Sequence, residues 1–149
     1  MKTQQLILIL FFGLAFFTGC KNEEIKHNIL FISIDDLKPS INSYGDAKMI
    51  TPNIDKLASE GVQFNNAFTN IAVCGASRAS LMTGIRPSEK RFNDFSTRAA
   101  KDVPDAISLN ELFKNNGYET ISYGKIYHHN DDFGEHWTEI GERAEHCLL

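Results

Sequence analysis

Three short stretches of the sequence carry side chains that could do chemistry together. Cys74 opens the run Cys-Gly-Ala-Ser-Arg, which leaves room around the thiol and places Arg78 four positions later. Asp35 and Asp36 are adjacent carboxylates at the end of an apolar run, and residues 124–129 read Gly-Lys-Ile-Tyr-His-His. A reactive thiol needs a neighbouring base. No histidine lies within ten residues of Cys74, and the nearest histidines in sequence, His27 and His128, are both far away.

The two aspartates follow a predicted buried strand. Ile29–Ile34 is a short, β-branched and almost continuous apolar run, which is typical of a strand covered on both faces in a parallel sheet. Ligands bind beyond the carboxyl ends of such strands. Adjacent carboxylates there are costly unless a cation neutralises them, and a hard metal ion is the usual solution. A solvated turn explains Asp35 and Asp36 equally well when they are taken alone.

The next stretch predicts a helix followed by a strand. Thr51 is placed to cap a helix that has Pro52 at its first position and ends at Gly61. Val62–Phe68 alternates between apolar and polar residues, which indicates a strand. A second helix is expected over residues 79–83, so that Cys74 lies just before a helix start, in a field that favours anions.

A third helix and strand lead to the lysine and the histidines. Ser108 and Glu111 form a capping box for a helix that stops at Gly117, and Tyr118–Tyr123 is the strand that follows. Helices alternating with strands predict an α/β fold with a largely parallel, doubly wound sheet. The strand ends then carry the chemistry, with Lys125 and its neighbours beyond one strand and the two aspartates beyond another.

The N-terminal residues are expected to be a targeting segment. Leu6–Phe17 is an apolar run of about a dozen residues, too short to span a bilayer comfortably. The run ends in a sequence that resembles the bacterial lipobox, where cleavage leaves Cys20 as a lipidated N-terminus. We expect residues 1–19 to be a lipoprotein signal peptide and residues 20–27 a lipidated tether, so that the protein is exported and membrane-anchored, in the periplasm or at the cell surface. The alternative is an ordinary signal peptide in which Cys20 is incidental.

The composition and net charge of the chain argue against one class of binding partner. The chain has 149 residues with a formal net charge of −4 and no basic patch, which argues against a nucleic-acid partner. Its length is enough for one domain core. Besides Cys20, the sequence contains Cys74 and Cys147, and a disulfide between these two stays open because spacing does not fix connectivity.

Residues 28–128 resemble the N-terminal part of type I sulfatases, in the alkaline-phosphatase-like superfamily. The resemblance rests on the adjacent aspartates, the Thr-Pro-Asn-Ile-Asp helix entry, and Cys-Gly-Ala-Ser-Arg with Leu-Met-Thr-Gly downstream. The run Asp-Asp-Leu-Lys-Pro-Ser and the two residues between Lys125 and His128 are closest to the iduronate 2-sulfatase branch. The resemblance implies that residues 28–149 are an incomplete catalytic domain, since the remaining family residues would lie downstream.

The resemblance also implies a chemistry for the thiol. In this family a maturation enzyme reads Cys-x-Pro/Ala-x-Arg in the unfolded chain and oxidises the cysteine, here Cys74, to Cα-formylglycine. The hydrated aldehyde carries two hydroxyls on one carbon. One hydroxyl attacks the sulfur of a sulfate ester and forms a covalent sulfoenzyme. Deprotonation of the other hydroxyl then re-forms the carbonyl and expels sulfate.

Roles carry over to the matching positions. Asp35 and Asp36, with the modified Cys74, would bind calcium, which acidifies the attacking hydroxyl and polarises the sulfate. Arg78 would hold the formylglycine side chain, and Lys125 would contact a sulfate oxygen.

His128 would be the base that expels sulfate. Taken without the resemblance, Lys125 is a solvated charge and His128 an ordinary surface histidine, and His129 could exchange roles with its neighbour. The implied function is hydrolysis of sulfate esters on a sulfated sugar or polysaccharide. Two alternatives remain: a phosphate or phosphonate ester hydrolase of the same superfamily, and a truncated surface lipoprotein without catalysis.

Overall fold

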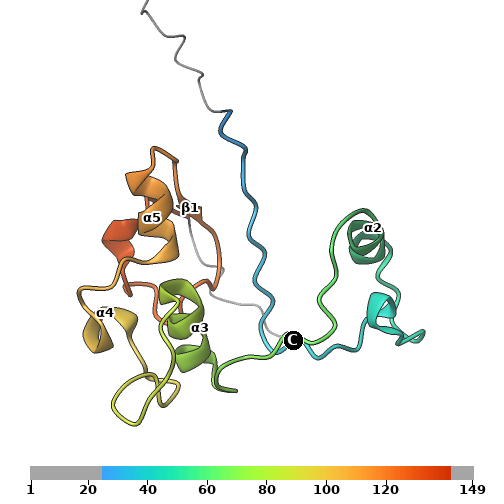
Figure 1. Cartoon of the computed structure of the whole chain (residues 1–149), viewed down its shortest axis with the longest axis horizontal. Helices are drawn as coiled ribbons and strands as arrows, with labels where there is room; N and C mark the ends of the chain where they lie inside the picture. Colours follow the sequence, from blue (N-terminus) through green and yellow to red (C-terminus); the bar gives the residue numbers. More distant parts are fainter. Residues whose placement is uncertain (1–24, 142–149) are drawn as a thin grey trace, which may run out of the picture. The chain divides into compact units, whose positions relative to one another are not determined.

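A computed structural model describes residues 25–141 of the chain (Figure 1). The chain divides into two compact units, Met1–Phe31 and Ile32–Leu149, and all elements given below belong to the second. The predictions for the signal peptide, Cys20 and Cys147 fall outside the described residues. Within residues 25–141, none of the helices has the length and apolar character needed to cross a membrane.

Short helices dominate the described part of the chain. In order, the elements are the 3-10 helix η2 (Asn42–Tyr44), α2 (Pro52–Glu60), α3 (Cys74–Thr83), α4 (Ala99–Asp102), α5 (Leu109–Asn115), β1 (Ile121–Ser122), the 3-10 helix η3 (Gly134–His136) and β2 (Glu139–Ile140).

The predicted helix after Thr51 is confirmed as α2, but the Thr51 side chain does not cap the N-terminus of the helix as expected. Thr51 occupies the N-cap position without capping the backbone. Its hydroxyl instead donates to Asp55 Oδ1 at 3.0 Å. Asn42 of η2 donates its side-chain amide to the other oxygen of Asp55 at 2.9 Å. These contacts join η2 and α2 through side chains.

The predicted third helix is confirmed as α5. Ser108 is its N-cap, and the Ser108 hydroxyl accepts from the Glu111 amide at 3.3 Å. The Glu111 carboxylate lies 3.6 Å from His136 Nδ1, so it is oriented toward η3. Gly117 follows the helix with φ +76°, a conformation that glycine adopts without a steric cost.

The strands differ most from the predictions. No strand is assigned at Ile29–Ile34 or at Val62–Phe68, and the large apolar side chains of both runs are exposed, so these two predictions are wrong for the described structure. A strand requires a hydrogen-bonded partner, which neither run finds among residues 25–141. The strand after Gly117 shortens to β1.

The sheet that does form is parallel. β1 pairs with β2, with Ile121 opposite Glu139 and Ser122 opposite Ile140. β2 was not predicted, because residues beyond Trp137 carry no strand pattern. The described fold is therefore α/β with a small, two-stranded parallel sheet.

The core forms around α3. One face of this helix consists of small or flexible apolar residues, which pack against the loop residue Phe92, the start of α4 and the segment after β1. The buried members of this core are Ala76, Ala79, Met82, Phe92, Ala99, Tyr127 and Phe133. The core thus holds α3 against the segment that carries Lys125 and His128.

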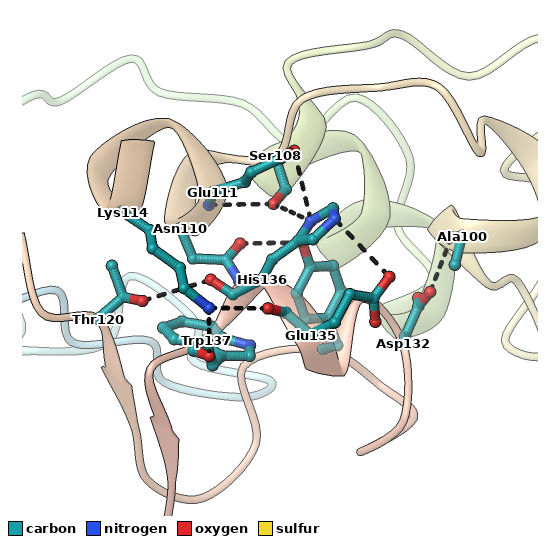
Figure 2. A network of polar contacts seen from close by, with 11 residues as sticks. Ala100, Ser108, Asn110, Glu111, Lys114, Thr120, Asp132, Glu135, His136 and Trp137 are labelled. Atoms are coloured by element: carbon teal, nitrogen blue, oxygen red, sulfur yellow. Dashed lines mark hydrogen bonds and ion pairs between the residues drawn. The ribbon is translucent and has the colours of Figure 1, made fainter. Parts of the chain in front are cut away.

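Polar contacts fix residues 133–137, which follow the segment that carries Lys125 and His128 (Figure 2). The ring of His136 stacks on Phe133, and its Nδ1 lies 2.8 Å from the buried Ser108 hydroxyl. Lys114 donates to the carbonyls of Glu135 and Trp137, each at 2.9 Å. Residues 133–137 are therefore tied to α5 by both side chains and backbone.

Candidate active site

Cys74 is the first residue of α3. The helix runs from Cys74 to Thr83 with Val73 at the N-cap, so the prediction of a helix over residues 79–83 covered only its second half. Cys74 has a free, half-buried thiol. The α3 N-terminus favours negative charge at this position.

Arg78 lies one turn along the same helix and is 5% exposed. Its Nη1 donates to Ser33 Oγ at 3.1 Å and to the carbonyl oxygens of Lys125 and Ile126 at 2.6 and 2.9 Å. Its Nη2 donates to Asp35 Oδ1 at 2.9 Å. One guanidinium therefore joins α3 to two distant segments. The planar fork of donors suits this task, which a lysine with a single ammonium could not perform.

Asp35 is held between two cations. One of its oxygens pairs with Arg78, and the other accepts a short hydrogen bond from Lys125 Nζ. The hydrogen bond from Lys125, followed by that from Arg78, lowers the pKa of Asp35 below its ordinary value of 3.8. Asp35 is therefore ionised, and it orients the ammonium group of Lys125.

Asp36 has a different environment. Its backbone adopts the left-handed conformation with φ +52°, which aspartate tolerates better than most residues, and its side chain is exposed. Two neighbouring carboxylates offer the hard oxygen ligands that calcium prefers, but calcium takes about six to eight such ligands. No group of three or more His, Cys, Asp or Glu side chains that could hold a metal occurs within residues 25–141. Asp35 and Asp36 thus fit as part of a calcium site and do not complete one.

His128 lies beside the thiol. Its Nδ1 is 3.4 Å from Cys74 Sγ, across 54 residues of sequence. The two residues meet despite this separation, because the core folds the segment after β1 back onto α3. The His128 ring also meets Phe95 edge-on, with ring centroids 6.4 Å apart.

His129 contacts its neighbour and not the thiol. Its ring lies at right angles to that of His128, with centroids 4.8 Å apart, and its Nε2 is buried with no hydrogen-bond partner among the described residues. Of the two histidines, it is His128 whose ring nitrogen reaches Cys74.

The structure adds two residues that the sequence analysis did not single out. Ser33 accepts a hydrogen bond from Arg78, and Phe95 packs against His128. Ser33 could have been noticed as the one polar residue inside the Ile29–Ile34 run. For Phe95 the sequence carries only a turn motif, Asp-Phe-Ser-Thr, with no sign of what the ring contacts.

The arrangement suits chemistry on an anionic ester. A nucleophile position at a helix N-terminus, a histidine within reach of it, and an arginine and a lysine nearby are the groups that such a reaction requires. The structure brings Cys74, Arg78, Asp35, Lys125 and His128 together, and their roles remain predictions.

Comparison with known proteins identifies the class. The family model described as Sulfatase matches residues 27–138, and the chain belongs to this family, whose fold is α/β and alkaline-phosphatase-like. The chain is 44% identical over 117 residues to iduronate 2-sulfatase of Mus musculus, covering 74% of the chain and 21% of that relative. It is 34% identical over 137 residues to N-acetylgalactosamine-6-O-sulfatase of Bacteroides thetaiotaomicron, covering 84% and 27%. The chain therefore spans about a fifth to a quarter of the length of these relatives.

Proposed function

We propose that the protein to which this chain belongs hydrolyses sulfate esters, with the residue at position 74 as the nucleophile. The observation that carries the proposal is the 3.4 Å approach of His128 Nδ1 to Cys74 Sγ, next to an arginine anchored by four hydrogen bonds. Membership of the sulfatase family and the sulfatase names of the relatives support it.

Cys74 acts as the precursor of Cα-formylglycine. The run Cys-Gly-Ala-Ser-Arg has the arginine at the spacing that the maturation enzyme reads. After conversion, Cys74 Sγ marks the position of a hydroxyl oxygen of the aldehyde hydrate. The Nδ1 atom of His128 then lies within reach of that hydroxyl and removes the proton whose loss re-forms the carbonyl and expels sulfate.

The cations bind the negative charge of the ester. Arg78 positions the first turn of α3 through its hydrogen bonds to two distant chain segments, and it balances charge near the nucleophile. The Nζ of Lys125 is oriented by Asp35 and contacts a sulfate oxygen.

Calcium completes the site. Asp35, Asp36 and an oxygen on the converted Cys74 would contribute ligands, and the other ligands would come from outside residues 25–141. When bound there, calcium would supply Lewis-acid chemistry that polarises the sulfate and lowers the pKa of the attacking hydroxyl.

The exposed apolar runs belong to a larger sheet. In the whole protein, Ile29–Ile34 and Val62–Phe68 pair with strands outside the described residues and form a largely parallel, doubly wound sheet. Their present exposure supports this assignment, because covering the large apolar side chains of both runs with further strands is favourable.

The substrate is a sulfated carbohydrate. Relatives named for N-acetylgalactosamine 6-sulfate and N-acetylglucosamine 6-sulfate support a sugar, as does the similarity to iduronate 2-sulfatase. Phosphate or phosphonate esters are the second candidate class, because the same cations would bind them.

A lipid on Cys20 anchors the protein to a membrane, in the periplasm or at the cell surface. The proposal rests on the apolar run Leu6–Phe17 and the small residues before Cys20. Cys20→Ala should move the full-length protein from the membrane fraction to the soluble fraction. A wild-type protein that is already soluble after export would contradict the lipid anchor.

Mass spectrometry of the full-length protein tests the mechanism. Active protein from a host with the maturation system should carry formylglycine in the peptide that contains Cys74, and this peptide should resist thiol alkylation. The same preparation should prefer sulfated saccharides over phosphate and phosphonate esters. An alkylatable Cys74 in fully active protein would overturn the mechanism. Phosphate preference would support the second candidate, and absence of turnover by converted protein would support a non-catalytic lipoprotein.

A further inference from the structure

Phe95 is an exposed phenylalanine that lies next to the candidate active site. Its side chain is 66% exposed, yet its ring lies edge-on to His128, with centroids 6.4 Å apart. Exposed phenylalanines are ordinary on protein surfaces, and exposure alone carries no meaning. Here the exposed ring borders the histidine that contacts Cys74, so it lies at the side of the nucleophile position.

The loop that carries Phe95 is held firmly. Asp94 Oδ1 accepts from the Ser96 amide at 2.9 Å and from the Ser96 hydroxyl at 2.7 Å. The buried hydroxyl of Thr97 accepts from the Asp94 amide at 3.3 Å. Phe95 is thus presented at the tip of a hydrogen-bonded turn, and ordering its ring on binding costs little entropy.

The backbone of the same loop touches the first turn of α3. A Cβ atom placed on Gly75 would lie 2.2 Å from the Phe95 carbonyl oxygen, so only glycine allows the loop to approach this closely. Because Gly75 directly follows Cys74, this contact fixes Phe95 relative to the nucleophile position.

We propose that Phe95 is a substrate-binding residue, whose ring packs against the apolar C–H face of the sugar that carries the sulfate ester. The inference rests on the proposed function and extends it to the sugar. The polar groups of the site, Arg78 and Lys125, serve the anionic sulfate. The sugar ring beside the sulfate offers a face of C–H groups, for which an exposed, preorganised aromatic ring is the complementary surface.

Binding measurements on full-length protein test this proposal. A Cys74→Ala background prevents turnover, so that a panel of sulfated uronate and hexosamine disaccharides stays intact during calorimetry. Adding Phe95→Ala should raise the Kd of the most tightly bound disaccharide about tenfold. Phe95→Tyr, which keeps the ring, should preserve the affinity, whereas Phe95→Leu, which keeps only apolar volume, should not. The affinity for inorganic sulfate should be the same in all variants, because sulfate has no sugar face.

Several outcomes of these binding measurements would contradict the role of Phe95. Unchanged disaccharide affinity in Phe95→Ala, wild-type affinity in Phe95→Leu, or failure of every disaccharide to bind the parent protein would overturn the proposal. In converted protein with an intact position 74, a lower kcat of Phe95→Ala at unchanged KM would show instead that Phe95 positions His128. Sulfate-ester turnover by the converted parent tests the proposed function separately, so the two failures are distinguishable.

Discussion

Arg78 shows how a buried cation can organise a site. Its guanidinium donates to Ser33, to Asp35 and to two backbone carbonyls of the segment that ends at His128. Its spacing from Cys74 was visible in the sequence, whereas its acceptors were not, because they come from segments more than 40 residues away. The same holds for His128, whose contact with Cys74 depends on the fold alone.

Replacing His128 tests the role of the base. His128→Gln removes the proposed base, so sulfate release should slow and kcat should fall about 10²- to 10⁴-fold. The first step is unaffected, and a burst of one equivalent of released alcohol should precede the slow phase. Stopped-flow kinetics and intact-protein mass spectrometry would detect the burst and the covalent sulfate.

His129→Gln is the matched control, because His129 does not contact the thiol. It should keep most of the activity. Slow turnover of His128→Gln without a burst would contradict the assigned step.

The alkaline stability of the protein depends on Tyr127. Burial raises the pKa of Tyr127 above its ordinary value of 10.0, and its hydroxyl donates to Asn110 Oδ1 at 3.3 Å. The folded state therefore holds this proton more tightly than the unfolded state. The resulting stabilisation is complete below pH 10 and is lost as the pH rises above it.

The free energy of unfolding of the full-length protein, measured in urea between about pH 8 and pH 11, should fall more steeply for wild type than for Tyr127→Phe. Tyr123→Phe, at an exposed tyrosine, controls for the loss of a hydroxyl. Equal slopes for wild type and Tyr127→Phe would contradict the predicted burial.

Helices were easier to predict than strands, and the reason is physical. The signals that begin and end α2 and α5 lie within the helices or next to them, as Pro52, Ser108 and Gly117 illustrate. A strand depends on a partner that can lie anywhere in the sequence. Ile29–Ile34 has the right pattern and no partner among the described residues, whereas β2 has a partner and no pattern.

The two glycines at the ends of α3 are required for different reasons, one steric and the other conformational. A Cβ at Gly75 would meet the Phe95 carbonyl, whereas Gly84 has open space but a left-handed φ of +69°. Gly75→Ala and Gly84→Ala should each destabilise the full-length protein, by about 1–3 and about 1–2 kcal/mol respectively. Chemical denaturation measures both costs.

Only Gly75→Ala displaces the loop that carries Phe95. Disaccharide affinity should therefore fall in Gly75→Ala and stay unchanged in Gly84→Ala. Both variants keep the cysteine, alanine and arginine of the maturation motif. Equal disaccharide affinity in the two variants would show that the loop tolerates a methyl group at Gly75.

At the scale of the whole molecule, exposed apolar surface is the dominant feature. The side chains of Ile29–Ile34, Val62, Phe64 and Phe68 are largely uncovered, although the core around α3 is closed. The chain also spans only 21% of the length of the iduronate 2-sulfatase that it resembles. Surface of this kind is usual where further polypeptide packs.

Residues 25–149 prepared alone should therefore associate and bind a hydrophobic dye, because the exposed apolar runs offer apolar surface and unpaired backbone to other chains. Size-exclusion chromatography and dye fluorescence would show both effects, and a longer protein that includes the rest of the sulfatase domain should show neither. A monomeric short chain that binds no dye would mean that these runs are covered without further polypeptide.

The separation of Cys74 and His128 in sequence determines how long one is synthesised before the other. The two residues are 54 positions apart, and a ribosome adds about 5–20 residues per second. Cys74 is therefore made about 3–11 s before the histidine that will lie against it. During that interval the cysteine is part of a chain that cannot yet close the site, which is the state that the proposed maturation step requires. The intervening segment, which contains most of α3 and all of α4, α5 and β1, thus gives the proposed modification time to occur before the site is enclosed.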